Sequence, residues 1–161
     1  MIVVSDTSPI INLAIIGRLE LLPKLFGEVI LPKAVYEEIV INGKDEPGAN
    51  EVSSAKWIRI EECKNITFVE LLKAELDVGE AEAITLAIEL HANALLMDEA
   101  KGREIASQNN INVLGLLGIL LEAKQKGLIQ SVKDEMDKLI HDAGFWVSKK
   151  IYNQVLKLSD E

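Results

Sequence analysis

Short apolar runs alternate with longer helical segments along this chain, and this alternation restricts the possible folds more than any other feature of the sequence. Strands that are separated by helices of ten or more residues favour right-handed crossovers, which build a parallel sheet with helices on both faces. The pattern therefore predicts an α/β domain. The expected strands are residues 2–4, 28–31, 57–60, 94–97 and 111–114, and the expected helices are residues 10–16, 18–26, 32–42, 67–76, 79–91, 99–108, 118–126, 130–143 and 148–158, with a loop at residues 43–50.

The length and composition fit one cytoplasmic domain. The chain has 161 residues, and no internal repeat or linker divides residues 1–161. Hydrophobic residues make up 48% of the chain, which is enough for a sizeable core. There are 26 acidic and 17 basic residues, and the resulting charge of −9 excludes a polybasic nucleic-acid coat. Because Cys63 is alone and no apolar stretch is as long as a membrane helix, we expect a soluble protein without disulfides.

Two acidic residues stand where expected strands end. Asp6 follows the run at residues 2–4, and Asp98 follows the run at residues 94–97. Ligands of open α/β sheets bind at the carboxyl ends of strands, where the strand order reverses. A carboxylate that is half-withdrawn from water at such a position is costly unless a cation neutralises it. The two acids therefore point to a metal ion.

Two expected helices offer further acids for such a site. In the first helix, Glu38 lies at the margin of the apolar face at 100° per residue, whereas Glu37 points away from it. In the second helix, Glu80 lies inside the apolar arc and in the first turn, where the helix dipole stabilises an anion. Glu82 lies on the more polar side of the same helix. The helical positions favour Glu38 and Glu80, and Glu82 remains an alternative.

The candidate ligands are all carboxylates. A cluster of oxygen ligands without His or Cys suits Mg²⁺ or Mn²⁺ rather than zinc. Such a centre commonly binds a phosphate ester and activates water for attack on it. A solvated surface position is the plainer explanation for any one of these acids taken alone. Their joint placement favours a metal site formed by Asp6, Glu38, Glu80 or Glu82, and Asp98.

Four acidic motifs resemble, in their order along the chain, those of PIN-domain proteins. These proteins are the nucleases named after the PilT N-terminus, and they include VapC-type toxins. The motifs are IVVSDTSP at residues 2–9, LPKAVYEEI at 31–39, GEAEAI at 79–84 and LLMDE at 95–99, followed by Gly102 and Arg103. The resemblance extends from residue 2 to about residue 121 and includes VLGLLGILL at 113–121.

The resemblance implies a parallel sheet flanked by helices, a ribonuclease centre that depends on Mg²⁺ or Mn²⁺, products with a 5′-phosphate and a 3′-hydroxyl, and often dimers. Asp6 matches the family's first acid, Glu38 its second and Asp98 its last. Glu80 stands eighteen residues before Asp98, which is the usual spacing of the third acid, while Glu82 stands sixteen before it. Glu82 stays an alternative ligand, and Glu99 is a possible fifth acid near the metal.

Three further residues are candidates for substrate contacts, and one residue departs from the family. The hydroxyls of Thr7 and Ser8 could bind a ligand carboxylate or the scissile phosphate, or could instead cap a helix. Arg103 could contact RNA phosphate or lie on the surface. PIN domains often have Thr or Ser two residues before the last acid, where this chain has Leu96. Either another group supports Asp98, or activity is reduced.

These observations lead to two main hypotheses. In the first, the protein is a metal-dependent endoribonuclease that cleaves single-stranded RNA, as the toxin of a toxin–antitoxin pair with a small antitoxin and a homodimeric state. In the second, it is a non-catalytic RNA- or protein-binding module, to which Leu96 points. A phosphatase-like enzyme ranks last because the second Asp of an Asp-x-Asp motif is missing after Asp6. The C-terminal helices at residues 130–158 either pack on the core or form an interface.

Overall fold

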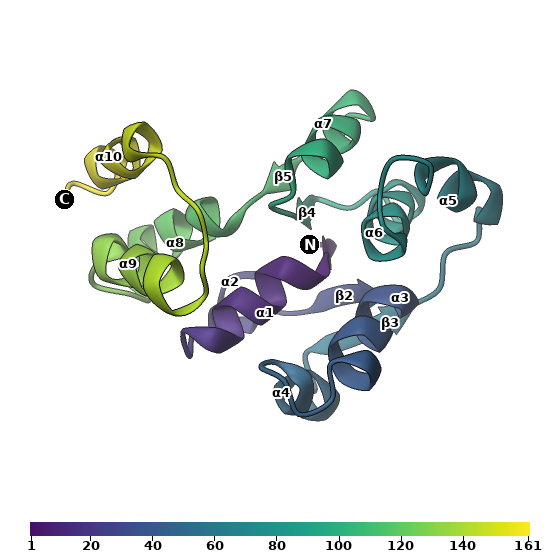
Figure 1. Ribbon diagram of the computed structural model, residues 1–161, viewed down its shortest axis with the longest axis horizontal. Helices are drawn as coiled ribbons and strands as arrows, with labels where there is room; N and C mark the ends of the chain where they lie inside the picture. The colour runs from purple at the N-terminus through teal and green to yellow at the C-terminus, as the bar shows by residue number, and fades with distance from the viewer.

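The computed structural model describes residues 1–161 and contains one parallel sheet with the strand order β3-β2-β1-β4-β5 (Figure 1). Every neighbouring pair of strands is parallel, which confirms the predicted α/β class. The chain builds outward from β1 to β2 and β3, and then crosses to the other side of β1 for β4 and β5. The strands are β1 (Val3–Ser5), β2 (Val29–Pro32), β3 (Ile58–Glu61), β4 (Ala94–Leu96) and β5 (Val113–Leu114).

The strand order reverses between β1 and β4, and this reversal places the carboxyl ends of the two strands at the position where α/β proteins bind ligands. The register pairs Val4 with Leu95 and Ser5 with Leu96, so both strands end at the same level of the sheet. The residues that follow β1 and β4 therefore come together, although more than ninety positions separate Asp6 from Asp98 in the sequence.

Helices connect the strands and continue after the last of them (Figure 1). One short element, η1, is a π-helix that continues directly from α3. The elements are α1 (Thr7–Ile15), α2 (Leu21–Phe26), α3 (Lys33–Tyr36), η1 (Glu37–Asn42), α4 (Ala49–Ser54), α5 (Ile66–Leu72), α6 (Val78–Glu89), α7 (Ala100–Gln108), α8 (Leu116–Gln125), α9 (Val132–Asp142) and α10 (Lys149–Leu158).

The two faces of the sheet are covered by separate hydrophobic clusters. Successive strand residues point to opposite faces, so Val3 belongs to the cluster that contains α1, α2, α8 and α9, and Val4 belongs to the cluster that contains α5, α6 and α7. In β4, Leu96 faces the first cluster and Leu95 the second. All four side chains are fully buried, which explains why the strands are apolar throughout rather than alternating.

The structure corrects three expectations near the ends of the strands. The N-cap of α1 is Asp6, and neither Thr7 nor Ser8 caps this helix, because both lie within its first turn. The expected helix 32–42 widens into a π-helix from Glu37 onward, so the regular 100° spacing does not hold there. The expected loop 43–50 is shorter than predicted, because α4 begins at Ala49.

The C-terminal helices fold back onto the rest of the chain. Helices α9 and α10 contact each other and α8, and Val155 of α10 lies in the core. The hydroxyl of Tyr152 donates a hydrogen bond of 2.6 Å to Asp137 Oδ1 and so joins α10 to α9. This arrangement confirms core packing for these helices, while Trp146 and Leu158 stay exposed. No helix combines the length and the apolar character that crossing a membrane requires.

Candidate active site

A cavity of about 520 Å³ lies beyond the carboxyl ends of β1 and β4. Carboxylates dominate its lining, and no lysine or arginine contributes to it. Four of the predicted acids line this cavity together. The lining residues are Asp6, Thr7, Ser8, Ile11, Asn12, Glu38, Asp77, Glu80, Asp98 and Glu99.

Asp6 is held at the centre of this arrangement by the sheet itself. It follows β1 directly, and its backbone amide donates a hydrogen bond of 2.9 Å to the carbonyl oxygen of Leu96 in β4. This bond continues the pairing of the two strands by one residue. Only 5% of Asp6 is exposed, and its side chain makes no capping hydrogen bond to α1. The carboxylate of Asp6 is therefore buried and is not used by its own helix.

Asp98 reaches the cavity from the end of β4. Its Oδ1 atom accepts a hydrogen bond of 3.0 Å from the backbone amide of Leu116, the first residue of α8. Its Oδ2 atom is buried and has no hydrogen-bond partner. A buried carboxylate oxygen without a partner is costly, because it has lost its water without gaining a donor. This oxygen is thus available to a ligand.

Gly115 makes the placement of Asp98 possible. A Cβ atom at position 115 would lie 2.8 Å from Asp98 Oδ1 and 2.5 Å from Arg103 Nη1. Both distances are shorter than real Cβ contacts allow, so any side chain at this position would displace the carboxylate or the guanidinium. The glycine therefore lets the start of α8 approach Asp98 closely enough to donate its amide.

The Leu116 amide also explains how Asp98 is held although residue 96 is a leucine without a hydroxyl. Leu96 stands where PIN domains often have a hydroxyl, and its side chain is fully buried in the core. No hydroxyl of that residue can hold Asp98 in this chain. The Leu116 amide holds the carboxylate instead. Asp98 therefore has a different support from the one that the family pattern provides.

Glu38 enters the cavity from the π-helix η1 and is held by Thr7. The hydroxyl of Thr7 donates a hydrogen bond of 2.9 Å to Glu38 Oε2, across 31 positions of the sequence. One of the two roles expected for Thr7, a hydrogen bond to an acid of the site, is thus what the structure shows. The neighbouring Glu37 forms an exposed pair with Lys33 and does not line the cavity.

Glu80 is positioned by a reciprocal pair of hydrogen bonds at the start of α6. The amide of Glu80 donates to Asp77 Oδ1 at 2.8 Å, and the amide of Asp77 donates to Glu80 Oε1 at 3.0 Å, which forms a capping box. Glu80 is 8% exposed. Sequence reasoning missed Asp77 as a residue of the site, although the capping-box spacing of an Asp three residues before a Glu could have identified it.

The other predicted residues divide between the cavity and its surroundings. Glu82 lies outside the cavity, where its Oε1 atom accepts a hydrogen bond of 3.0 Å from the Ala34 amide at the start of α3. Glu99 lines the cavity and caps α7 by accepting a hydrogen bond of 2.7 Å from Gly102. Ser8 also lines it, and its hydroxyl accepts a hydrogen bond from Asn12. Arg103 lies just outside and borders Asp98 from the other side of Gly115.

Burial and mutual repulsion change the acidity of these groups. Burial, together with the nearby Asp77, Glu38 and Asp98, raises the pKa of Asp6 to about 7, while a hydrogen bond from the Thr7 backbone acts in the opposite direction. Burial likewise raises the pKa of Glu80 to about 7 and that of Asp98 above its ordinary value. By contrast, the hydrogen bond from Gly102 lowers the pKa of Glu99. The raised pKa values of Asp6 and Glu80 thus reflect burial among other acids, whereas Arg103 partly offsets the effect of burial on the pKa of Asp98.

The residues of the cavity fit a divalent cation in their chemistry. The donors are carboxylate oxygens without sulfur or imidazole, which suits Mg²⁺ or Mn²⁺. The buried oxygen of Asp98 without a partner marks a place where a cation would compensate lost hydration. In the present side-chain positions, however, no group of three or more Asp, Glu, His or Cys residues is arranged to hold a metal ion.

Comparison with known protein families gives one match. The model of a family described as a PIN domain matches residues 2–161, which is nearly the whole chain. The match includes the C-terminal helices as well as the four acidic motifs. Neither the comparison with curated proteins nor that with solved structures found a match.

Proposed function

The chain belongs to the PIN-domain family, whose members are generally nucleases. We therefore propose that it is a metal-dependent endoribonuclease that cleaves single-stranded RNA. The observation that carries the proposal is the cavity at the ends of β1 and β4. It gathers Asp6, Glu38, Glu80 and Asp98 from four separate parts of the chain, and no lysine or arginine lines it. An acidic cavity of this kind attracts divalent cations, and through them phosphate groups.

In this proposal, Asp6, Glu38, Glu80 and Asp98 hold the cation. A bound Mg²⁺ or Mn²⁺ would neutralise the charge of the phosphate and increase the acidity of water at neutral pH. Thr7 holds Glu38 in the cavity, and Asp77 orients Glu80 through the capping box. The third acid is Glu80 rather than Glu82, because Glu82 already binds the start of α3.

The carboxyl groups of Asp6 and Glu80 also bind and release protons near neutral pH. Their pKa values of about 7 mean that each carries a proton for part of the time near neutral pH. Opposite charge favours the ionised form, so both acids release their protons when a cation enters. Ser8 and Asn12, which line the same cavity, can donate hydrogen bonds to phosphate oxygens. The overall charge of −9 disfavours tight, non-specific binding of the RNA backbone.

The experiment that tests this function compares wild type with Asp6→Asn on a labelled single-stranded RNA in the presence of Mn²⁺. We expect the wild type to cleave the RNA and the variant to lose cleavage while it keeps its fold and its RNA affinity. Equal cleavage by both proteins would remove Asp6 from the mechanism.

A second function is favoured by one observation. No three acids are arranged to hold a metal ion as the side chains stand, which is compatible with a PIN domain that binds RNA or a protein without cleaving it. RNA binding without cleavage, by wild type in Mn²⁺ as well as in Mg²⁺, would support this alternative over the nuclease.

We also propose that the protein acts as the toxin of a toxin–antitoxin pair and forms a homodimer. The order of the four acidic motifs, which resembles that of VapC-type toxins, supports the toxin role. A short neighbouring reading frame that encodes a small DNA-binding protein would favour the role, and its product should suppress cleavage when the two proteins are mixed. Cleavage that persists in the presence of that product would count against it.

A further inference from the structure

A second cavity adjoins the acidic one on the far side of Asp98. It has a volume of about 560 Å³, and its lining residues come from α7, β5, the start of α8, the segment before α10 and the start of α10. Asp98 lines both cavities. We call the second cavity the side groove, and its principal lining residues are Arg103, Val113, Leu114, Leu117, Phe145 and Ile151.

The side groove differs in character from the acidic cavity. Its walls are mainly aliphatic, and Phe145 adds one aromatic ring. Arg103 stands beside Asp98 and forms no salt bridge, since its Nη1 atom makes only a long hydrogen bond of 3.4 Å to the Met97 carbonyl oxygen. An apolar space with a guanidinium that forms no salt bridge suits an apolar ring joined to an anionic group.

Two further cations stand next to a residue of the groove in the sequence, although they do not line it. Lys149 and Lys150 precede Ile151 at the start of α10, both are exposed, and neither forms a salt bridge. Phe145 is fixed in place because its amide donates a hydrogen bond of 2.9 Å to the Leu139 carbonyl oxygen and its side chain packs against the core. The groove is thus a formed space with Arg103 in its lining, in a protein that is acidic overall.

We propose that the side groove binds one nucleobase of single-stranded RNA, next to the phosphate that lies at Asp98. The inference rests on the proposed function, because Asp98 connects the groove to the cavity where the phosphate would bind. Base stacking on Phe145 supplies affinity with little dependence on sequence, and Arg103 contacts the backbone of the same nucleotide. The volume is that of a small-ligand pocket. A second copy of the chain would instead need a broad contact of roughly 800 Å² on each partner.

The test measures RNA binding rather than cleavage, with EDTA present so that no substrate is consumed. The probes are a short fluorescent single-stranded RNA and a matched set in which one nucleotide at a time lacks its base. The proteins are wild type, Phe145→Leu, which keeps an apolar side chain but removes the ring, and Ile151→Asp, which places a negative charge in the groove. Trp146→Leu is the matched control, because Trp146 is 81% exposed and does not line the groove.

We expect Phe145→Leu to weaken binding of the intact RNA about 5- to 100-fold, the range that corresponds to the stacking of one base. One abasic position should weaken binding to the wild type by a similar factor and should cause little further loss in Phe145→Leu. Ile151→Asp should also bind more weakly, and its exposed position makes it a second test should Phe145→Leu fail to fold. Trp146→Leu should bind as the wild type does.

Three outcomes would overturn the inference. The first is unchanged binding by both Phe145→Leu and Ile151→Asp. The second is independent, additive losses from the variant and the abasic position, which would place the base elsewhere. The third is a shift in oligomeric state in light scattering for either variant, which would assign the groove to a second copy of the chain. Because binding is measured without metal, a failure of the nuclease proposal would appear only in the cleavage assay with Asp6→Asn.

Discussion

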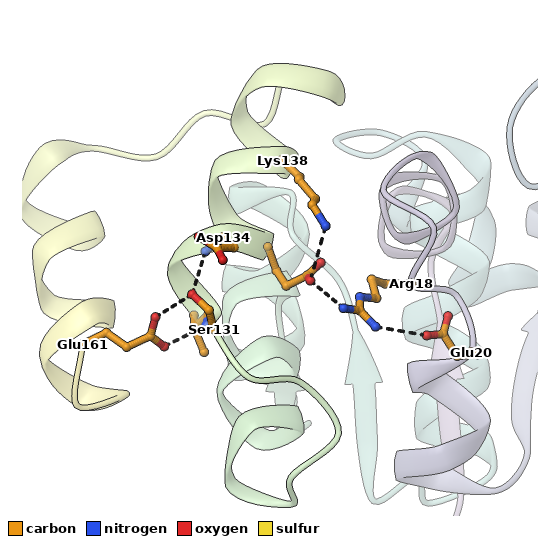
Figure 2. A network of polar contacts seen from close by, with 8 residues as sticks. Arg18, Glu20, Ser131, Asp134, Lys138 and Glu161 are labelled. Carbon is orange, nitrogen blue, oxygen red and sulfur yellow. Dashed lines mark hydrogen bonds and ion pairs between the residues drawn. The ribbon is translucent and has the colours of Figure 1, made fainter.

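Two groups of buried carboxylates in this protein have opposite surroundings. In the acidic cavity, Asp6 and Glu80 have only other acids and backbone amides near them. Around α9, Glu135 is 4% exposed, and its Oε1 atom lies 2.8 Å from the guanidinium of Arg18 and 3.6 Å from the ammonium of Lys138 (Figure 2). The second group is neutralised within the chain, whereas the first is not.

Glu161 is another carboxylate whose negative charge is compensated by donors of the same chain. Its carboxylate accepts hydrogen bonds from Lys124 and from the amides of Val132 and Lys133 at the start of α9. It also accepts one from the Ser131 hydroxyl (Figure 2). Although burial raises its pKa, these donors lower it to about 2. Glu161 itself is exposed. The pKa of Asp6, which is buried among other acids, is about 7. Burial and the available partners together therefore separate the carboxylates that stabilise the fold from those that are free to bind a cation.

We expect the largest effect in RNA cleavage, where substitutions of Glu80 and Glu82, two acids of α6, should differ. Glu80→Gln should reduce kcat/KM for RNA cleavage by on the order of 1,000-fold, or about 4 kcal/mol, because it removes a proposed cation ligand while Gln still completes the capping box. Glu82→Gln, which changes a structural acid one half-turn away, should stay within a few-fold of wild type. Cleavage assays in Mn²⁺ measure kcat/KM for both variants. Equal losses would show that acids in the cavity and acids bound to other elements do not differ in function.

The second effect concerns stability and its dependence on pH. Because the pKa of Asp6 is about 7 in the folded chain and near 3.8 in the unfolded chain, the folded state binds more protons between these values, and ionisation destabilises it as the pH rises toward 7. Asp6→Asn should therefore be about 2–4 kcal/mol more stable than wild type at pH 8, and the difference should vanish toward pH 4. Urea unfolding of metal-free protein at both pH values tests this. A variant less stable than wild type at pH 8 would contradict it.

We expect a smaller effect on stability when the ion pair between Arg18 and the buried Glu135 is removed. Arg18→Ala should destabilise the protein by about 2 kcal/mol, because the carboxylate of Glu135 stays buried with only Lys138 near it. Arg59→Ala is the matched control, since Arg59 pairs with two exposed acids and should cost less than about 1 kcal/mol. Thermal or urea unfolding distinguishes them, and an equal cost for both would remove the special role of the Glu135 pair.

The smallest effect comes from Glu161. Glu161→Gln should lower the free energy of unfolding by about 1 kcal/mol at pH 7, because a neutral amide interacts more weakly with Lys124 and with the amides that begin α9. Since the folded pKa of Glu161 is lowered, this contribution is complete above pH 4.5 and is lost as the pH falls toward 2, opposite in sign to that of Asp6. Glu70→Gln, at an exposed pair with Lys73, is the control and should change stability less. A larger loss at pH 3 than at pH 7 would contradict the assignment.

Much of the fold follows from local patterns. The positions of β1, β2 and β4 match the apolar runs, and Asp6 and Asp98 stand at strand ends because the chain turns polar where it leaves the sheet. The π-helix η1 was not predicted, since helical periodicity assumes a regular turn. The short helix α4 was also missed, because Pro47 and Gly48 next to it indicate a loop.

The sequence by itself determined the parallel α/β architecture, the acids at the ends of the strands and the oxygen-rich chemistry of the cavity, because these depend on residue types and on spacing within single elements. Only the tertiary structure decided that Glu82 binds α3 rather than the cavity, and that Leu116 supports Asp98 in place of a hydroxyl. Each of these contacts forms between elements whose relative positions are set by the packing of helices on the sheet. No pattern within one element contains that information.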